Sequence, residues 1–185
     1  MAAPARSGLT YADLARFPDD HLRREIIGGQ LVVTPAPRTR HQDVVLFLAT
    51  ELTLHVRAHG GHAYVAPLDV VFTDDNVVEP DVVYLSGDHL DRIGEKCVHG
   101  PPDLVVEVSS PSTRHLELVG KRALYERFGV PEYWYVDLDA DRIEVYRLAG
   151  NSYSAPSLRI ATDTLTSPLF PGLSLDVAGV LHPYG

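Results

Sequence analysis

The chain has 185 residues, of which 45% are hydrophobic and 22% charged, and its net charge is −9 at pH 7. This composition predicts one globular domain over residues 1–185, with residues 1–8 and 182–185 flexible, and it argues against a protein that coats nucleic acid by charge alone. No apolar run approaches the roughly 20 residues that cross a bilayer, and the single cysteine, Cys97, predicts a cytoplasmic protein without an internal disulfide.

The first third of the chain predicts a helix, a hairpin and a second helix. Residues 11–17 are typical of a short helix, which Pro18 ends. The segment EIIGGQLVVT predicts a β-hairpin, because apolar strand residues flank a Gly28-Gly29 pair that suits a tight turn. From residue 41 to residue 59, apolar residues recur every three or four positions, which indicates a helix.

The rest of the chain alternates strands with one more helix. Residues 63–73 and 77–85 predict two strands, and LVVEVSS predicts a central strand that is covered on both faces. A helix is expected from about residue 113 to residue 128, followed by strands at EYWYVD, RIEVYRL and SYSAPSLRIA. This order predicts an α/β (α+β) fold, in which helices flank a mixed β-sheet core with an N-terminal hairpin and additional C-terminal strands.

Two acidic residues stand inside apolar strands. Side chains alternate along a strand, so Glu107 shares a face with Val105 and not with Val106. A carboxylate there is costly unless it is paired or binds a metal. Asp81 follows Pro80, which cannot donate to a sheet ladder and could aim the acid toward a neighbouring strand. Each acid alone could equally be a strand-end carboxylate on a solvated face, but the two together could share one Mg²⁺ or Mn²⁺ ion.

The predicted helix over residues 113–128 carries a candidate lysine. A helical period places Glu117, Lys121 and Tyr125 in one sector that also holds large apolar groups. One interpretation is an i,i+4 ion pair between Glu117 and Lys121 at the edge of that face. The other is a lysine that points inward to meet a charged site, and the helix alone does not separate the two.

These segments together resemble a known group of enzymes. Their motifs are Pro80-Asp81, then Glu107-Val108-Ser109, then Lys121 and the segment GVPEYWYVD. These motifs look like those of the PD-(D/E)XK nuclease superfamily. More narrowly, they resemble its Uma-two type of restriction endonucleases, from about Leu9 to Val177. The resemblance implies a restriction-endonuclease-like mixed sheet, a bound Mg²⁺ or Mn²⁺ ion and hydrolysis of phosphodiester bonds in DNA.

The resemblance also implies roles for individual residues. Asp81 and Glu107 would be the metal-binding carboxylates, and Glu25 would add a further ligand. The superfamily lysine sits two residues after the second acid, where this chain has Ser109, so the resemblance transfers its role to Lys121 in the following helix. Glu25, Glu117 and Ser109 would then support the site, with Glu117 positioning the lysine.

Two functions from different classes stay open. Asp81, Glu107 and Lys121 favour a metal-dependent endonuclease that acts on DNA, as a homodimer, because cutting both strands of a duplex calls for two sites. The acidic net charge and the serine at position 109 favour a binding or assembly protein that keeps the nuclease fold without turnover. The sequence does not separate duplex, single-stranded, branched or RNA substrates.

Overall fold

The computed structural model describes residues 8–18, 20, 22–110 and 116–184 of the chain. Within these ranges the larger sheet has seven strands in the order β11-β10-β9-β8-β6-β3, with β12 also paired to β10. Its strands are β3 (His62–Val65), β6 (Val82–Leu85), β8 (Leu104–Val108), β9 (Glu132–Asp137), β10 (Arg142–Ala149), β11 (Ser152–Tyr153) and β12 (Ser157–Ile160). Strands β8 and β9 are parallel and the other neighbours are antiparallel, so the sheet is mixed as predicted.

A smaller sheet lies against one face of the larger one. In the part of the chain that the structure describes, it has five strands in the order β2-β1-β5-β4-β7. These strands are β1 (Arg23–Ile27), β2 (Gln30–Thr34), β4 (Asp69–Thr73), β5 (Asn76–Val78) and β7 (Cys97–His99). Strands β1 and β2 form the predicted hairpin, and both turn glycines have positive φ angles of 59° and 77°, which glycine adopts at little cost. Two short strands, β13 (Thr164–Leu165) and β14 (Leu175–Asp176), pair separately.

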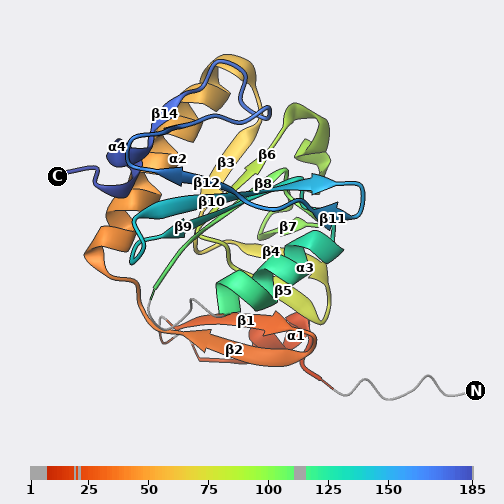
Figure 1. The fold of residues 1–185 in the computed structure, drawn as a ribbon. Coiled ribbons are helices and arrows are strands. Elements are labelled where there is room, and N and C mark those ends of the chain that lie inside the picture. Colours follow the sequence, from red (N-terminus) through yellow and green to blue (C-terminus); the bar gives the residue numbers. More distant parts are fainter. Residues whose placement is uncertain (1–7, 19, 21, 111–115, 185) are drawn as a thin grey trace, which may run out of the picture.

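Helices cover both faces of the larger sheet (Figure 1). The helices of the described residues are α1 (Tyr11–Leu14), α2 (Thr39–His59), the 3₁₀ helix η1 (Gly87–Arg92), the π-helix η2 (Leu116–Lys121), α3 (Arg122–Arg127) and α4 (Val177–Leu181). Helices α2 and α4 pack on one face, and α3 with the smaller sheet packs on the other. The described residues contain no helix that is both long and apolar enough to cross a membrane.

The two long strands predicted at residues 63–73 and 77–85 are each broken in the structure. The first is divided at Ala66-Pro67 and the second at Glu79-Pro80-Asp81. Proline has no backbone N–H to donate, so a ladder stops where it stands. At each break the chain crosses between the two sheets, because β3 and β6 belong to the larger sheet and β4 and β5 to the smaller one. The prediction of unbroken strands was therefore wrong, and the break places Asp81 at the junction of the sheets.

The helix predicted from residue 113 to residue 128 also differs. Its first residues, 113–115, lie outside the described ranges, and the remainder begins as the π-helix η2 before it becomes α3. The π-turn widens the backbone just where Lys121 points inward, and such turns often occur at functional sites. Strand β7 and helix α4 were not predicted.

The central strand β8 is covered on both faces, as predicted. All five of its residues are buried. Leu104, Val106 and Val108 pack under α2, while Val105 packs with residues of α3 and the smaller sheet. Because side chains alternate, Glu107 points to the same side as Val105. The carboxylate of Glu107 is therefore enclosed between the two sheets.

Candidate active site

Asp81 is held by partners from three separate elements. Its Oδ1 lies 2.9 Å from Nη2 of Arg23 in β1, and its Oδ2 lies 3.0 Å from Nε2 of His41 in α2. The backbone N–H of Val108 in β8 donates to the same Oδ2 at 2.8 Å. Only 1% of Asp81 is exposed. The carboxylate is thus fixed in position where the hairpin, the long helix and the central strand meet.

The partners of Asp81 keep it ionised. Burial by itself would raise the pKa of this carboxyl, but the hydrogen bond and charge of His41, the charge of Arg23 and the Val108 N–H together lower the pKa to about 2. The same attraction raises the pKa of the Arg23 guanidinium in spite of its burial. At neutral pH Asp81 therefore carries a full negative charge that is already oriented.

Behind Asp81, one lysine links two buried carboxylates. Lys121 Nζ lies 2.7 Å from Glu25 Oε1 and 2.9 Å from Glu107 Oε1. Tyr125 Oη donates to the same oxygen of Glu107 at 2.5 Å. Glu25 Oε1 also accepts from the backbone N–H of Glu79 at 2.8 Å. These contacts join β1, β8 and the η2–α3 helix into one charged network inside the protein.

The charges in this network oppose one another. Burial raises the pKa of Glu107, the Lys121 ammonium lowers it, and the nearby Asp81 and Glu25 carboxylates raise it again, so that its pKa is about 7. Lys121 is also buried, which by itself lowers its pKa, but Glu107 and Glu25 raise the pKa above its ordinary value. Lys121 therefore stays protonated at neutral pH, while Glu107 exchanges a proton near that pH.

The hydrogen bond from Tyr125 lowers the pKa of Glu107, so Tyr125→Phe is expected to raise that pKa further. Between pH 4.5 and pH 7 the folded protein keeps a proton on Glu107 that the unfolded chain has released. The contribution of Glu107 to the free energy of unfolding therefore falls as pH rises through this range. We expect Tyr125→Phe to lower the free energy of unfolding by about 1 kcal/mol more at pH 8 than at pH 5. At pH 8 Glu107 is ionised, and a hydrogen bond to a charged acceptor is stronger than one to a neutral acceptor. Urea denaturation at both pH values measures this difference.

The matched control for that experiment is Tyr153→Phe, whose hydroxyl donates to the Val130 carbonyl oxygen at 3.0 Å, away from Glu107. Its loss of stability should be the same at pH 5 and pH 8. Equal losses at the two pH values in Tyr125→Phe would contradict the role given to Tyr125.

Of the residues that the sequence proposed, four lie together. Glu107, Lys121 and Glu25 belong to the network, and Asp81 lies near enough for its charge to raise the pKa of Glu107. Of the two orientations considered for Lys121, the structure has the inward one. Ser109 follows the last residue of β8. Its hydroxyl oxygen accepts a hydrogen bond from the Leu138 N–H at 2.9 Å, which connects the end of β8 to the end of β9.

Glu117 is buried in the first turn of η2. Its backbone carbonyl oxygen accepts a hydrogen bond from Tyr133 Oη at 3.3 Å. The contacts described above for Lys121 Nζ run to Glu25 and Glu107, so a role for the Glu117 carboxylate in positioning the lysine stays a prediction.

Sequence reasoning did not assign roles to four residues of the site. Arg23 and His41 hold Asp81, Tyr125 holds Glu107, and Glu79 lies 3.8 Å from the Arg23 guanidinium. Two of them carried a usable signal. Arg23 precedes Glu25 by two positions and so shares its strand face, and Tyr125 follows Lys121 by one helical turn.

The donor set suits a hard divalent cation, although the described side chains do not form a complete set of metal ligands. Within the described residues, no group of three or more His, Cys, Asp or Glu side chains is arranged to hold a metal. Glu25 Oε2 and Glu107 Oε2, however, are buried oxygens without a hydrogen-bond partner there. Mg²⁺ commonly binds one or two carboxylates and takes its other ligands from water and substrate phosphates. Asp81 and Glu107, with Glu25 nearby, match that mode of binding.

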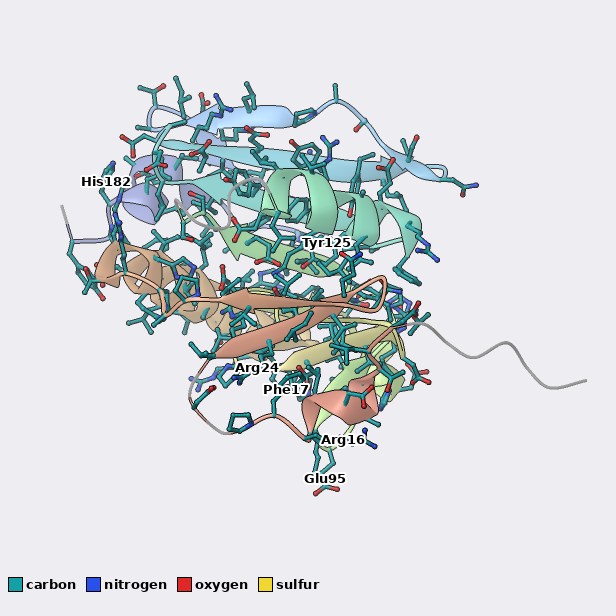
Figure 2. The ribbon with its side chains drawn as sticks, turned by 90° about the horizontal axis from the view of Figure 1, so that it is seen from below. Arg16, Phe17, Arg24, Glu95, Tyr125 and His182 are labelled. Atoms are coloured by element: carbon teal, nitrogen blue, oxygen red, sulfur yellow. The ribbon has the colours of Figure 1, made fainter. Side chains whose placement is uncertain are left out.

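A pocket of about 420 Å³ opens over Asp81. Arg23, His41 and Glu79 line it beside Asp81. Burial and the neighbouring Asp69 and Glu25 charges raise the pKa of Glu79 to about 7, although Arg23 lowers it. Arg24 also lines the pocket, and its guanidinium lies 5.2 Å from the centre of the Phe17 ring. Figure 2 shows these two residues near the β1–β2 hairpin, with Tyr125 labelled at α3.

Comparison with known proteins identifies the family and the fold of the chain. The sequence model of the Uma2 family, described as a putative restriction endonuclease, matches residues 10–178. Among solved structures, the fold is similar to a crystal structure of a putative nuclease belonging to DUF820 from Anabaena variabilis, with a TM-score of 0.78. The two chains are 17% identical, and the match covers 94% of this chain and 97% of the other. A search of curated proteins found no match.

Proposed function

Because the chain belongs to the Uma2 family of putative restriction endonucleases, we propose that it is a metal-dependent nuclease that hydrolyses phosphodiester bonds in DNA. The observation that carries this proposal is the buried network of Glu25, Glu107 and Lys121, together with the buried Asp81 in the lining of the pocket. Burying two carboxylates around one lysine, with a third carboxylate nearby, costs folding free energy, and such arrangements are concentrated at functional sites.

The proposed chemistry divides among the residues of the network. Asp81 and Glu107, with Glu25 as a further oxygen donor, would hold a Mg²⁺ or Mn²⁺ ion, which supplies Lewis-acid activation of a phosphoryl oxygen and of water. Lys121 would neutralise the charge that builds on the phosphorane oxygens or orient the attacking water. His41 and Arg23 keep Asp81 ionised and oriented before substrate arrives.

Metal binding is expected to strengthen as pH rises, because a cation needs the ionised form of Glu107, whose pKa is about 7. The ionised fraction of such a group rises from about one tenth at pH 6 to about nine tenths at pH 8. We therefore expect the Mn²⁺ affinity, measured by isothermal titration calorimetry, to rise about tenfold over this range. In Glu107→Gln the affinity should be lower and should not rise in this way. An affinity that is independent of pH in the wild type would contradict the assignment of Glu107.

A second function, binding or assembly without turnover, is favoured by the acidic net charge and by the hydrogen bonds that already occupy Asp81. The same calorimetry distinguishes the two functions. If millimolar Mn²⁺ does not bind and no DNA is cut, the inert protein is the better account. If Mn²⁺ binds to the wild type and more weakly to Glu107→Gln, the nuclease is supported.

Three further features belong to the same proposal. We propose that residues 1–185 form one domain, that the protein acts as a homodimer, and that it works in the reducing cytoplasm. The family match from residue 10 to residue 178 supports the single domain. The buried free thiol of Cys97 supports the reducing cytoplasm. Analytical ultracentrifugation tests the homodimer, since two sites are needed to cut both strands of a duplex.

A further inference from the structure

The lining of the pocket over Asp81 combines charged and apolar side chains. Arg23, His41 and Glu79 line it beside Asp81, and Asp20 and Arg24 add a further pair of charges. Its apolar lining includes Pro18, Leu22, Pro35, Pro37, Val45 and Pro67. A volume of about 420 Å³ falls within the range of roughly 300–1,000 Å³ that encloses one drug-sized ligand. The pocket thus has the size and polarity for a molecule with one anionic group and one flat apolar part.

The depth of the acids limits how DNA can reach them. Asp81 lines the pocket and is 1% exposed, whereas Glu107 is 0% exposed and does not line the pocket. Asp81 is therefore the acid of the pair that a phosphodiester meets when it enters the pocket. In a stacked duplex each nucleotide is held between its neighbours and its paired base, and a volume that holds one ligand cannot admit the whole helix.

We propose that this pocket receives a single unpaired nucleotide, so that the substrate is DNA that is single-stranded or that carries an unpaired nucleotide. This inference rests on the proposed nuclease function and names the substrate class of the same site. The phosphate lies toward Arg23 and the cation site at Asp81, and the sugar and base lie between the proline-rich walls.

The walls suit this ligand for a physical reason. Proline has a fixed φ angle, so Pro35, Pro37 and Pro67 form surfaces that lose little conformational freedom when a base packs on them. Extruding a nucleotide from an intact duplex costs a few kcal/mol, whereas an unpaired nucleotide enters at a much lower cost. The net charge of −9 means that the protein surface attracts the phosphates of a duplex poorly. Surface attraction therefore does not offset the free energy that is needed to extrude a nucleotide from the duplex.

The test is a binding measurement that does not depend on turnover. Fluorescence anisotropy compares a labelled single strand with the same strand in a duplex, in Ca²⁺, a hard cation that carboxylates also bind. We expect the single strand to bind at least about tenfold more tightly. Thymidine monophosphate should compete with it and thymidine should not, because only the former carries the phosphate. A gel confirms that the probe stays intact.

A matched pair of variants locates the binding. Ala36 is exposed and lines the pocket, so Ala36→Trp should fill the pocket and weaken single-strand binding at least about tenfold. Ala155→Trp makes the same change at an exposed position between β11 and β12 and should leave binding unchanged. Equal effects of the two variants, or failure of thymidine monophosphate to compete, would overturn the proposed pocket.

The outcomes also separate this inference from the proposed function. If the protein cuts duplex as fast as single strands in Mg²⁺, the inference fails and the nuclease stands. If no DNA is cut in any metal but single-strand binding is lost in Ala36→Trp, the nuclease fails and the pocket assignment stands.

Discussion

Replacing Lys121 with methionine is expected to lower the free energy of unfolding by about 3–5 kcal/mol, the range seen when one partner of a buried ion pair is removed. Lys121 is 2% exposed and its ammonium touches both Glu25 and Glu107. Methionine fills a similar volume but leaves two buried carboxylates without their cation. Urea denaturation at pH 8 measures the loss, and cleavage of DNA should be lost as well.

The chain offers a matched control for this substitution. Its only other lysine, Lys96, is exposed, so Lys96→Met should change stability by no more than about 0.5 kcal/mol. The loss in Lys121→Met should shrink at pH 5, where Glu107 can take up a proton in place of its lost partner. A second substitution, Glu25→Gln, should recover part of the stability. A loss that is the same at pH 5 and pH 8 would show that packing, and not charge, explains the effect.

The second large effect is expected from Asp81→Asn. The substitution keeps the shape of the side chain but removes the negative charge that the proposed cation needs. We expect the rate of DNA cleavage in Mg²⁺ to fall by about 10²–10³-fold, the range found when one group that stabilises charge in a transition state is removed. A single-turnover cleavage assay with a labelled strand measures the chemical step directly.

Stability separates a catalytic effect of Asp81→Asn from an effect on folding. Because the pKa of Asp81 is lowered from 3.8 to about 2, its ionised form contributes stability above about pH 4, which is lost as pH falls toward 2. The asparagine variant should lack this part of the acid dependence while it remains folded at neutral pH. Asp91→Asn, on the exposed end of η1, is the control and should change neither property. Wild-type cleavage by folded Asp81→Asn would refute the role proposed for Asp81.

Much of the fold follows from local patterns. The Gly28-Gly29 turn, the three- and four-residue spacing of apolar groups in α2 and the β-branched run of β8 correctly predicted a hairpin, a helix and a central strand. Alternation along β8 also placed Glu107 on one particular face. These predictions hold because backbone geometry fixes the direction of each side chain within a single element.

The breaks in the strands were harder to predict from the sequence. Pro67 and Pro80 were visible, but proline is tolerated at edges and bulges as well as at strand ends, so its presence does not say where a chain changes sheets. The change of sheet at Pro80 decides the site, since it moves Asp81 to the junction of β1, α2 and β8.

The sequence by itself determined which acids are costly to bury and that Lys121 shares a helix face with Tyr125. Only the tertiary structure decided their partners: Arg23 lies 58 positions from Asp81, and His41 lies 40 positions from it. Local periodicity fixes the face on which a side chain lies, but the neighbours of that face depend on how two sheets and a helix pack together. The same packing encloses Glu107 and leaves Asp81 in the lining of the pocket.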